Sequence, residues 1–97
     1  MLDQISVVII TRDAAATLAE TLKSTRGFAE VVVYDNGSDD ATIEIAQAHD
    51  NVSLHEGDFM GFGPTKNHAV SLAKNDWVLS LDADEEVSAE LTQFLEQ

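Results

Sequence analysis

The stretch ISVVIITRDAAATLAETLKSTRGFAEVVVYD, residues 5–35, combines two strand patterns with a helix pattern between them. It begins and ends with continuous, largely β-branched runs, 5–10 and 30–34, which are typical of strands buried on both faces. Asp13 can cap a helix between them. The apolar residues of that helix recur at i, i+3, i+4 and i+7: Ala15, Leu18, Ala19 and Leu22. This order of elements predicts a parallel βαβ unit.

The same alternation continues to residue 97. After the turn signal DNGSDD we expect a helix over about 39–49, capped by Ser38 or Asp39, and then a strand over 52–55. A glycine-rich loop leads to a helix over about 64–74 with Pro64 in its first turn. A strand over 76–81 and a helix over about 89–96, capped by Ser88, complete the pattern. The pattern predicts one α/β domain over 1–97 with a mostly parallel sheet. Ligands of such sheets bind beyond the carboxyl ends of the strands.

Composition excludes several classes of function. The net charge of −13 argues against binding to nucleic acid or to anionic lipid, both of which attract basic surfaces. The absence of cysteine excludes disulfides, thiolate zinc sites and cysteine nucleophiles. No apolar run approaches the roughly 20 residues that span a bilayer, and the N-terminus has no basic signal-peptide region. We therefore expect a cytoplasmic protein.

The common phosphate-binding motifs are missing. The first strand leads into TRDAAA and not into G-x-G-x-x-G, which argues against a Rossmann dinucleotide site, and the chain contains no P-loop. Gly57, Gly61 and Gly63 form a weak signal by themselves. The simpler interpretation of these glycines is a flexible connection that needs positive φ.

An acidic cluster follows the last predicted strand in VLSLDADEEVS, residues 78–88. If Asp82 and Asp84 stay extended, their side chains point to the same side. Converging carboxylates favour a hard divalent cation such as Mg²⁺ or Mn²⁺, which takes further ligands from substrate phosphates. The simpler alternative is a solvated strand end that leads into a helix.

Two segments, VVVYDNGSDDAT (31–42) and DWVLSLDADEEVS (76–88), together resemble the family 2 glycosyltransferases, inverting enzymes with a Rossmann-like GT-A fold. The segment GFGPTKNHAV (61–70) is similar to the part that lies between these motifs, and the greatest similarity within the family is to bacterial lipopolysaccharide-core and lipooligosaccharide glycosyltransferases. The resemblance covers essentially the whole chain. Residues that match the motifs D-x-G-S-x-D-x-T and D-x-D are Asp35, Gly37, Ser38, Asp40, Thr42, Asp82 and Asp84.

The resemblance implies a donor site for a nucleotide-diphosphate sugar, with a UDP-sugar expected. Its nucleotide-sugar-binding residues would be Thr11, Asp35, Lys66, Asp82 and Ala83. Asp35 would accept a hydrogen bond from the uracil N–H, and Lys66 would face the phosphates. Asp84, with help from Asp82, would hold Mg²⁺ or Mn²⁺ at the diphosphate. The alternatives are an Asx turn at Asp35 and a solvated surface lysine at Lys66.

The resemblance also sets limits. Relatives often read T-K-N-E where this chain reads Thr11-Arg12-Asp13-Ala14, so the contacts made at the last two positions differ here. The family's general base lies well after the D-x-D, so no catalytic base is assigned. We expect residues 1–97 to be the donor-binding part of a transferase that acts on a glycan or lipid-linked acceptor, peripheral to the inner membrane face when complete. By itself this part should be weak or inactive in transfer, and exposed apolar surface should favour homo-oligomers.

Two alternatives stay open at this point. A receiver-like or regulatory α/β module also gathers acids around a divalent ion, but it needs an acidic pair after strand one and an aspartate after strand three. Here those strands lead to Thr11 and to His55-Glu56. The other alternative is a degenerate transferase fragment that acts as a scaffold. Trp77, which begins a predicted strand, is expected in the core.

Overall fold

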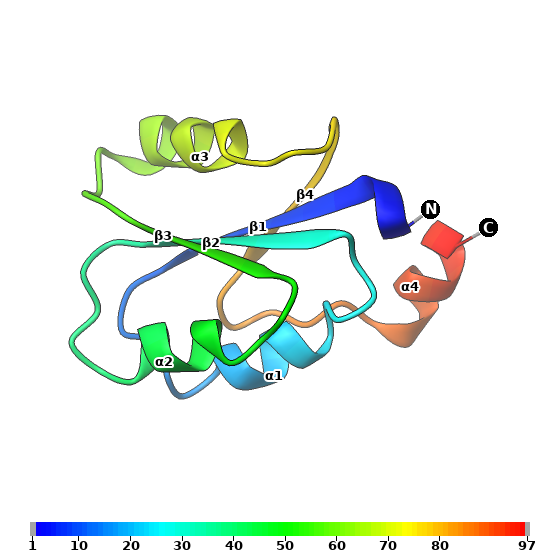
Figure 1. Ribbon diagram of the computed structural model, residues 1–97, viewed down its shortest axis with the longest axis horizontal. Coiled ribbons are helices and arrows are strands. Elements are labelled where there is room, and N and C mark those ends of the chain that lie inside the picture. The colour runs from blue at the N-terminus through cyan, green and yellow to red at the C-terminus, as the bar shows by residue number, and fades with distance from the viewer. Residues whose placement is uncertain (1, 97) are drawn as a thin grey trace.

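Strands and helices alternate along the computed structural model, which describes residues 2–96 (Figure 1). A short 3₁₀ turn, η1, precedes four strands and four helices. Their bounds are η1 Leu2–Gln4, β1 Ile5–Thr11, α1 Leu18–Lys23, β2 Glu30–Asp35, α2 Thr42–Gln47, β3 Val52–Glu56, α3 Phe62–Ser71, β4 Trp77–Asp82 and α4 Ala89–Glu96. The predicted α/β alternation is confirmed. None of the helices within 2–96 is long and apolar enough to cross a bilayer.

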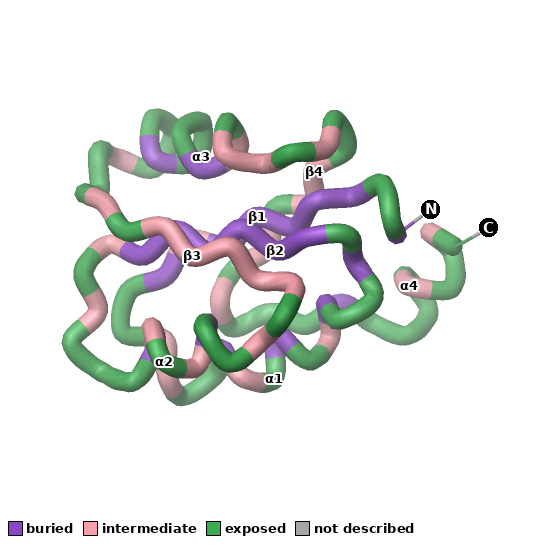
Figure 2. Tube along the Cα trace, viewed as in Figure 1, coloured by how far each residue is buried: buried purple, intermediate pink, exposed green. Residues whose placement is uncertain are grey.

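All four strands are parallel and lie in the order β3-β2-β1-β4. Helices α1 and α2 cover one face of the sheet, and α3 covers the other (Figure 1). The two central strands are the most buried part of the chain (Figure 2). Because both of their faces are covered, their sequences are continuously apolar and do not alternate with polar residues.

The strands separate two apolar clusters. On the α1 and α2 face, Val7, Ile9, Val31 and Val33 pack with Leu18 and Leu22, and each is at most 1% exposed. On the other face, Val8, Val32 and Tyr34 pack against Ala69 of α3. Successive residues of one strand thus enter opposite clusters, as the pleat of a strand requires.

The first two helices begin later than the sequence predicts. Helix α1 begins after Thr17, and α2 begins after Ala41, so neither Asp13 nor Ser38 nor Asp39 is an N-cap. Asp13 instead adopts a positive φ of 51° within the loop that follows β1. The capping prediction for α4 agrees with the structure, because the Leu91 N–H donates to the Ser88 Oγ at 3.1 Å.

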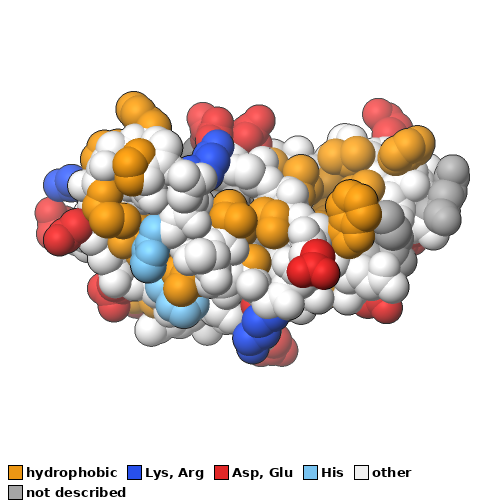
Figure 3. Space-filling model, turned by 90° about the horizontal axis from the view of Figure 1, so that it is seen from above, with side chains coloured by type: hydrophobic (Ala, Val, Ile, Leu, Met, Phe, Trp, Pro, Cys, Tyr) orange, Lys and Arg blue, Asp and Glu red, His pale blue; other side chains and the backbone are white. Residues whose placement is uncertain are grey.

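The prediction that Trp77 lies in the core is wrong. Trp77 is 64% exposed, because β4 is an edge strand that pairs with β1 alone. A shallow hollow of about 170 Å³ lies beside it, lined by Ile5, Trp77, Val78, Leu79, Leu91 and Leu95. Apolar side chains gather at this end of the molecule when it is seen from the α3 side (Figure 3).

Candidate nucleotide site

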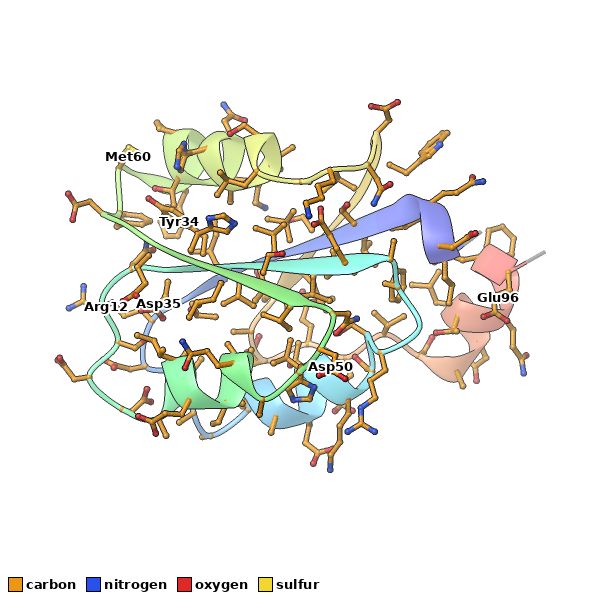
Figure 4. All side chains as sticks on the ribbon, viewed as in Figure 1. Arg12, Tyr34, Asp35, Asp50, Met60 and Glu96 are labelled. Carbon is orange, nitrogen blue, oxygen red and sulfur yellow. The ribbon has the colours of Figure 1, made fainter. Side chains whose placement is uncertain are left out.

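Polar side chains collect where the four strands end. Thr11, Asp35, Glu56 and Asp82 are the last residues of β1, β2, β3 and β4. Because the strands are parallel, these ends meet at one edge of the sheet, where Figure 4 labels Asp35 between the loops that follow β1 and β2. This edge is the expected place for a ligand in an open α/β sheet.

The Asp35 carboxylate is enclosed by the protein itself. Its Oδ1 accepts hydrogen bonds from the hydroxyls of Thr11 and Ser38, both at 2.6 Å. Its Oδ2 accepts from the N–H groups of Gly37 at 3.0 Å and Ser38 at 2.8 Å. Asp35 is 0% exposed, and these four bonds use all four acceptor positions of a carboxylate. A direct bond from Asp35 to a uracil N–H would require one of them to break.

These contacts keep Asp35 ionised. Burial raises the pKa of the Asp35 carboxyl, but the hydrogen bonds from Ser38, Thr11 and Gly37 together lower it by more, so the pKa lies below its ordinary value of 3.8. The geometry corresponds to the Asx-turn alternative for Asp35. Thr11 is also buried, at 1% exposure, and its hydroxyl is directed to Asp35. Both residues therefore shape the floor of the site.

The loops after β1 and β2 are held together by side chain-to-backbone hydrogen bonds that sequence reasoning missed. Asp13 accepts from the Asp39 N–H at 2.7 Å, and the Asp13 N–H donates to the Ser38 Oγ at 2.8 Å. The Ala14 N–H donates to the buried Thr42 Oγ1 at 2.8 Å. Asp13, at the position where relatives often have Asn, therefore joins the loop after β1 to the loop after β2. The spacing of D-x-G-S-x-D-x-T was the available signal, although it does not reveal which partner each residue takes.

The loop between β3 and α3 closes over the end of β2. The Gly57 N–H donates to the Asp35 carbonyl at 3.0 Å, and the Tyr34 hydroxyl donates to the Asp58 carbonyl at 3.2 Å. A Cβ on Gly57 would lie only 2.2 Å from the Tyr34 hydroxyl oxygen, so glycine is needed there for close approach. Gly61, at φ 95°, is the N-cap of α3. The glycine-rich loop is therefore fixed at several points and is not merely a flexible connection.

A hollow of about 400 Å³ opens between the ends of β1 and β4 and the first turns of α3. It is lined by Ile10, Phe59, Phe62, Gly63, Lys66 and Asp82. Two residues predicted for the donor site, Lys66 and Asp82, therefore share one hollow, and each is exposed. The first turn of α3 adds backbone N–H groups with no acceptor inside the helix. The hollow thus combines apolar walls with one cation and one anion.

The D-x-D segment is a turn and not an extension of the strand. Strand β4 ends at Asp82, and the Glu85 N–H donates to the Asp82 carbonyl at 3.0 Å across the turn. The Ala83 carbonyl accepts from the hydroxyls of Thr17 and Thr21 of α1, at 2.8 and 2.9 Å. The assumption that Asp82 and Asp84 stay extended therefore does not hold. Ala83 anchors the turn on α1, and Asp84 projects from an exposed position.

The Asp82 and Asp84 carboxylates could hold a hard cation together with ligands from outside the protein. Within residues 2–96, no group of three or more His, Cys, Asp or Glu side chains is arranged to hold a metal ion. The Asp82 and Asp84 carboxylates are exposed and accept no hydrogen bond from those residues, so their oxygens are available. One or two carboxylates completed by phosphate oxygens and water are a common Mg²⁺ arrangement.

A second hollow, of about 350 Å³, lies at the opposite ends of the strands. It is lined by Arg26, Ala48, His49, Asp50 and Asn51. These residues precede β2 and β3, so the hollow is at the amino ends of the strands, far from the polar strand ends described above. Parallel sheets bind their ligands at the carboxyl ends, which favours the first hollow.

Solved structures with the same fold include the S. aureus protein TarS, residues 1–349. The chain matches TarS in complex with UDP with a TM-score of 0.82 and 26% identity, over 96% of this chain and 31% of that one. The superposition identifies the chain as part of a glycosyltransferase fold of the GT-A kind. The predicted fold class is confirmed.

Sequence comparison gives the family. Residues 6–97 match Glycosyl transferase family 2, and the chain belongs to that family. An uncharacterized glycosyltransferase of Rickettsia felis is 38% identical over 96 residues, which are 98% of this chain and 34% of that protein. The lipopolysaccharide core biosynthesis glycosyltransferase LpsC of Rhizobium meliloti is 27% identical over 96 residues, 94% of this chain and 35% of LpsC. The chain spans about a third of the length of these relatives.

Proposed function

We propose that this chain binds the nucleotide-diphosphate part of a sugar donor, with UDP-sugar the expected donor, for transfer to a glycan or lipid-linked acceptor. The observation that supports this most is the hollow at the carboxyl ends of β1 and β4, which Lys66 and Asp82 line together. A UDP complex of the structural neighbour TarS supports the uridine nucleotide, and the similarity to LpsC supports a lipopolysaccharide acceptor.

The proposed roles come from the resemblance to the family, and the shared hollow of Lys66 and Asp82 supports them. Lys66 faces the diphosphate, and Asp82 accepts from the ribose hydroxyls. Asp84, assisted by Asp82, holds Mg²⁺ or Mn²⁺, which when bound neutralises the departing diphosphate. Thr11 and Asp35 have their polar atoms engaged with each other, and Ala83 has its carbonyl engaged with α1. We therefore propose that these three position the site: Thr11 and Asp35 support the nucleotide from below, and the half-buried Ala83 contacts it through the atoms that stay free.

The test is a calorimetric titration of the chain with UDP, with and without Mn²⁺. We expect saturable binding that Mn²⁺ strengthens, and we expect Asp84→Ala to abolish the metal-dependent part. Asp76→Ala is the matched control, because Asp76 is an exposed aspartate beside the opposite end of β4. Absence of UDP binding, or equal losses in the two variants, would contradict the proposal.

The acceptor reaction is outside the proposed capacity of this chain. No residue of 2–96 has been assigned as general base for the acceptor hydroxyl, and the chain spans about a third of its relatives. We propose that the isolated chain is weak or inactive in sugar transfer. The cytoplasmic location and the association with the inner membrane face stay predictions.

We also propose that the isolated chain self-associates through the β4 edge. Unpaired N–H and C=O groups on an edge strand can pair with another chain, and Trp77, Leu91 and Phe94 are exposed nearby, at 64%, 39% and 68%. The net charge of −13 opposes this association, so added salt should strengthen it.

A further inference from the structure

Two exposed aromatic residues form a wall of the hollow at the strand ends. Phe59 and Phe62 are 49% and 87% exposed, and Met60 between them is 49% exposed as well. Their rings meet edge to face, with centroids 5.2 Å apart and planes at 81°. Figure 3 shows apolar side chains gathered at this end of the α3 side. The fold alone gives no reason for two phenyl rings to remain so exposed.

The backbone holds this aromatic pair in place. The Met60 N–H, between the two rings, donates to the buried Thr65 Oγ1 at 2.7 Å. One residue before Phe59, the Asp58 carbonyl accepts from the Tyr34 hydroxyl. Figure 4 labels Met60 at the start of α3, above the end of β2 where Tyr34 lies. The rings are therefore presented from a fixed loop, which lowers the entropic cost of ligand binding.

The surroundings of the pair select one kind of occupant. We infer that Phe59 and Phe62 form the stacking wall for the base of the donor nucleotide, a refinement that rests on the proposed function. Phe62 has most of its ring surface free, and Ile10 adds an apolar floor. Lys66 and Asp82 in the same hollow complement the phosphate and the ribose. A volume of about 400 Å³ is within the usual range for a small-molecule site.

A membrane contact explains the same rings less well. Exposed phenyl rings can enter a lipid interface, but interfacial segments usually carry basic residues beside them. This chain has a net charge of −13, and the acidic residue Asp58 is adjacent to Phe59. The presence of Lys66 and Asp82 beside the rings in one hollow favours a ligand that is apolar at one end and charged at the other.

The test compares UDP, which carries a base, with inorganic pyrophosphate, which carries none. The double variant Phe59→Leu/Phe62→Leu keeps apolar side chains but removes the π faces. We expect it to bind UDP with Mn²⁺ about tenfold more weakly than the wild type, since stacking on aromatic side chains contributes roughly 5- to 150-fold per base. Affinity for inorganic pyrophosphate with Mn²⁺ should stay unchanged. Phe62→Trp should retain UDP binding, because it keeps an aromatic face.

Phe94→Leu is the matched control, because Phe94 is 68% exposed on α4 and does not line this hollow. If the wild type binds UDP and the double variant binds it equally well, or loses UDP and pyrophosphate in parallel, the stacking inference is overturned while the proposed function stands. If the wild type binds no UDP, both the stacking inference and the proposed function are overturned. Cosedimentation with phosphatidylcholine vesicles that the double variant loses, with UDP affinity unchanged, assigns the rings to a membrane and overturns the inference.

Discussion

Individual residues at the strand ends divide into those that shape the site and those that are free to bind. Asp35 accepts four hydrogen bonds and is 0% exposed, whereas Asp82 and Asp84 are exposed and accept none from residues 2–96. Sequence alone does not separate these roles, because an aspartate at the end of a strand can turn toward its own loop or toward solvent. Burial and the donors nearby make the difference.

Replacing Asp35 should destabilise the fold in a pH-dependent way. Asp35→Asn places amide hydrogens opposite groups that donate, at a cost of about 3 kcal/mol. Because the folded pKa of Asp35 is lowered from 3.8, the stability it contributes is fully present above about pH 3.8 and is lost as the pH falls through the folded pKa. Urea unfolding of wild type and variant at several pH values should therefore show a gap that is constant near neutrality and closes in acid.

Asp39→Asn is the control for this comparison, because Asp39 is an exposed aspartate of the same loop. It should leave the unfolding free energy within about 0.5 kcal/mol of the wild type. A gap between wild type and Asp35→Asn that stays unchanged down to the most acid pH at which both proteins still fold would show that the hydrogen bonds of Asp35 do not depend on its charge.

At the scale of elements, the order of strands and helices could be predicted from sequence, and the loops could not. Runs such as Val7 to Ile9 and Val31 to Val33 have no stable place except between two layers of helices, so they predict the parallel sheet directly. Asp13 lies in the loop before α1 and accepts a hydrogen bond from the Asp39 N–H, 26 residues away, which no local pattern contains. The position of Trp77 depended on β4 being an edge strand, which its apolar sequence does not indicate.

Thr42→Val tests whether the loops after β1 and β2 act as one unit. The change removes the oxygen that accepts from the Ala14 N–H, so that this N–H loses its partner, at a cost of about 1–3 kcal/mol. Hydrogen exchange at the Ala14 amide should become faster, and exchange in the loop after β2 should follow. Thr92→Val on α4 is the control. Unchanged exchange at Ala14 in Thr42→Val would show that the two loops are independent.

The sheet of the molecule has two edge strands, β3 and β4, and an apolar hollow lies beside β4. On the side of β4, apolar side chains from the strand and from α4 remain in solvent (Figure 3). An apolar patch of this kind marks a surface that another chain or segment covers.

Trp77→Lys should reduce self-association of the isolated chain, because a charged side chain on an edge strand opposes pairing with a second copy. Sedimentation velocity over a concentration series should show a rising average mass for the wild type and a monomer for the variant. Met60→Lys, at the other end of the molecule and with 49% exposure in the wild type, should associate as the wild type does. A wild type that is monomeric at every concentration would contradict self-association through β4.

If the carboxyl ends of the strands bind a metal–nucleotide complex, amide NMR spectra should locate the complex there. With UDP and Mg²⁺, we expect chemical-shift changes in residues 57–66 and 82–85. Substituting Mn²⁺ should broaden the amide signals of 82–85 first, because the paramagnetic ion would lie at Asp84. The hollow lined by Arg26, His49 and Asn51 should stay unaffected. Chemical-shift changes confined to that hollow, or none at all, would rule out binding at the carboxyl ends of the strands.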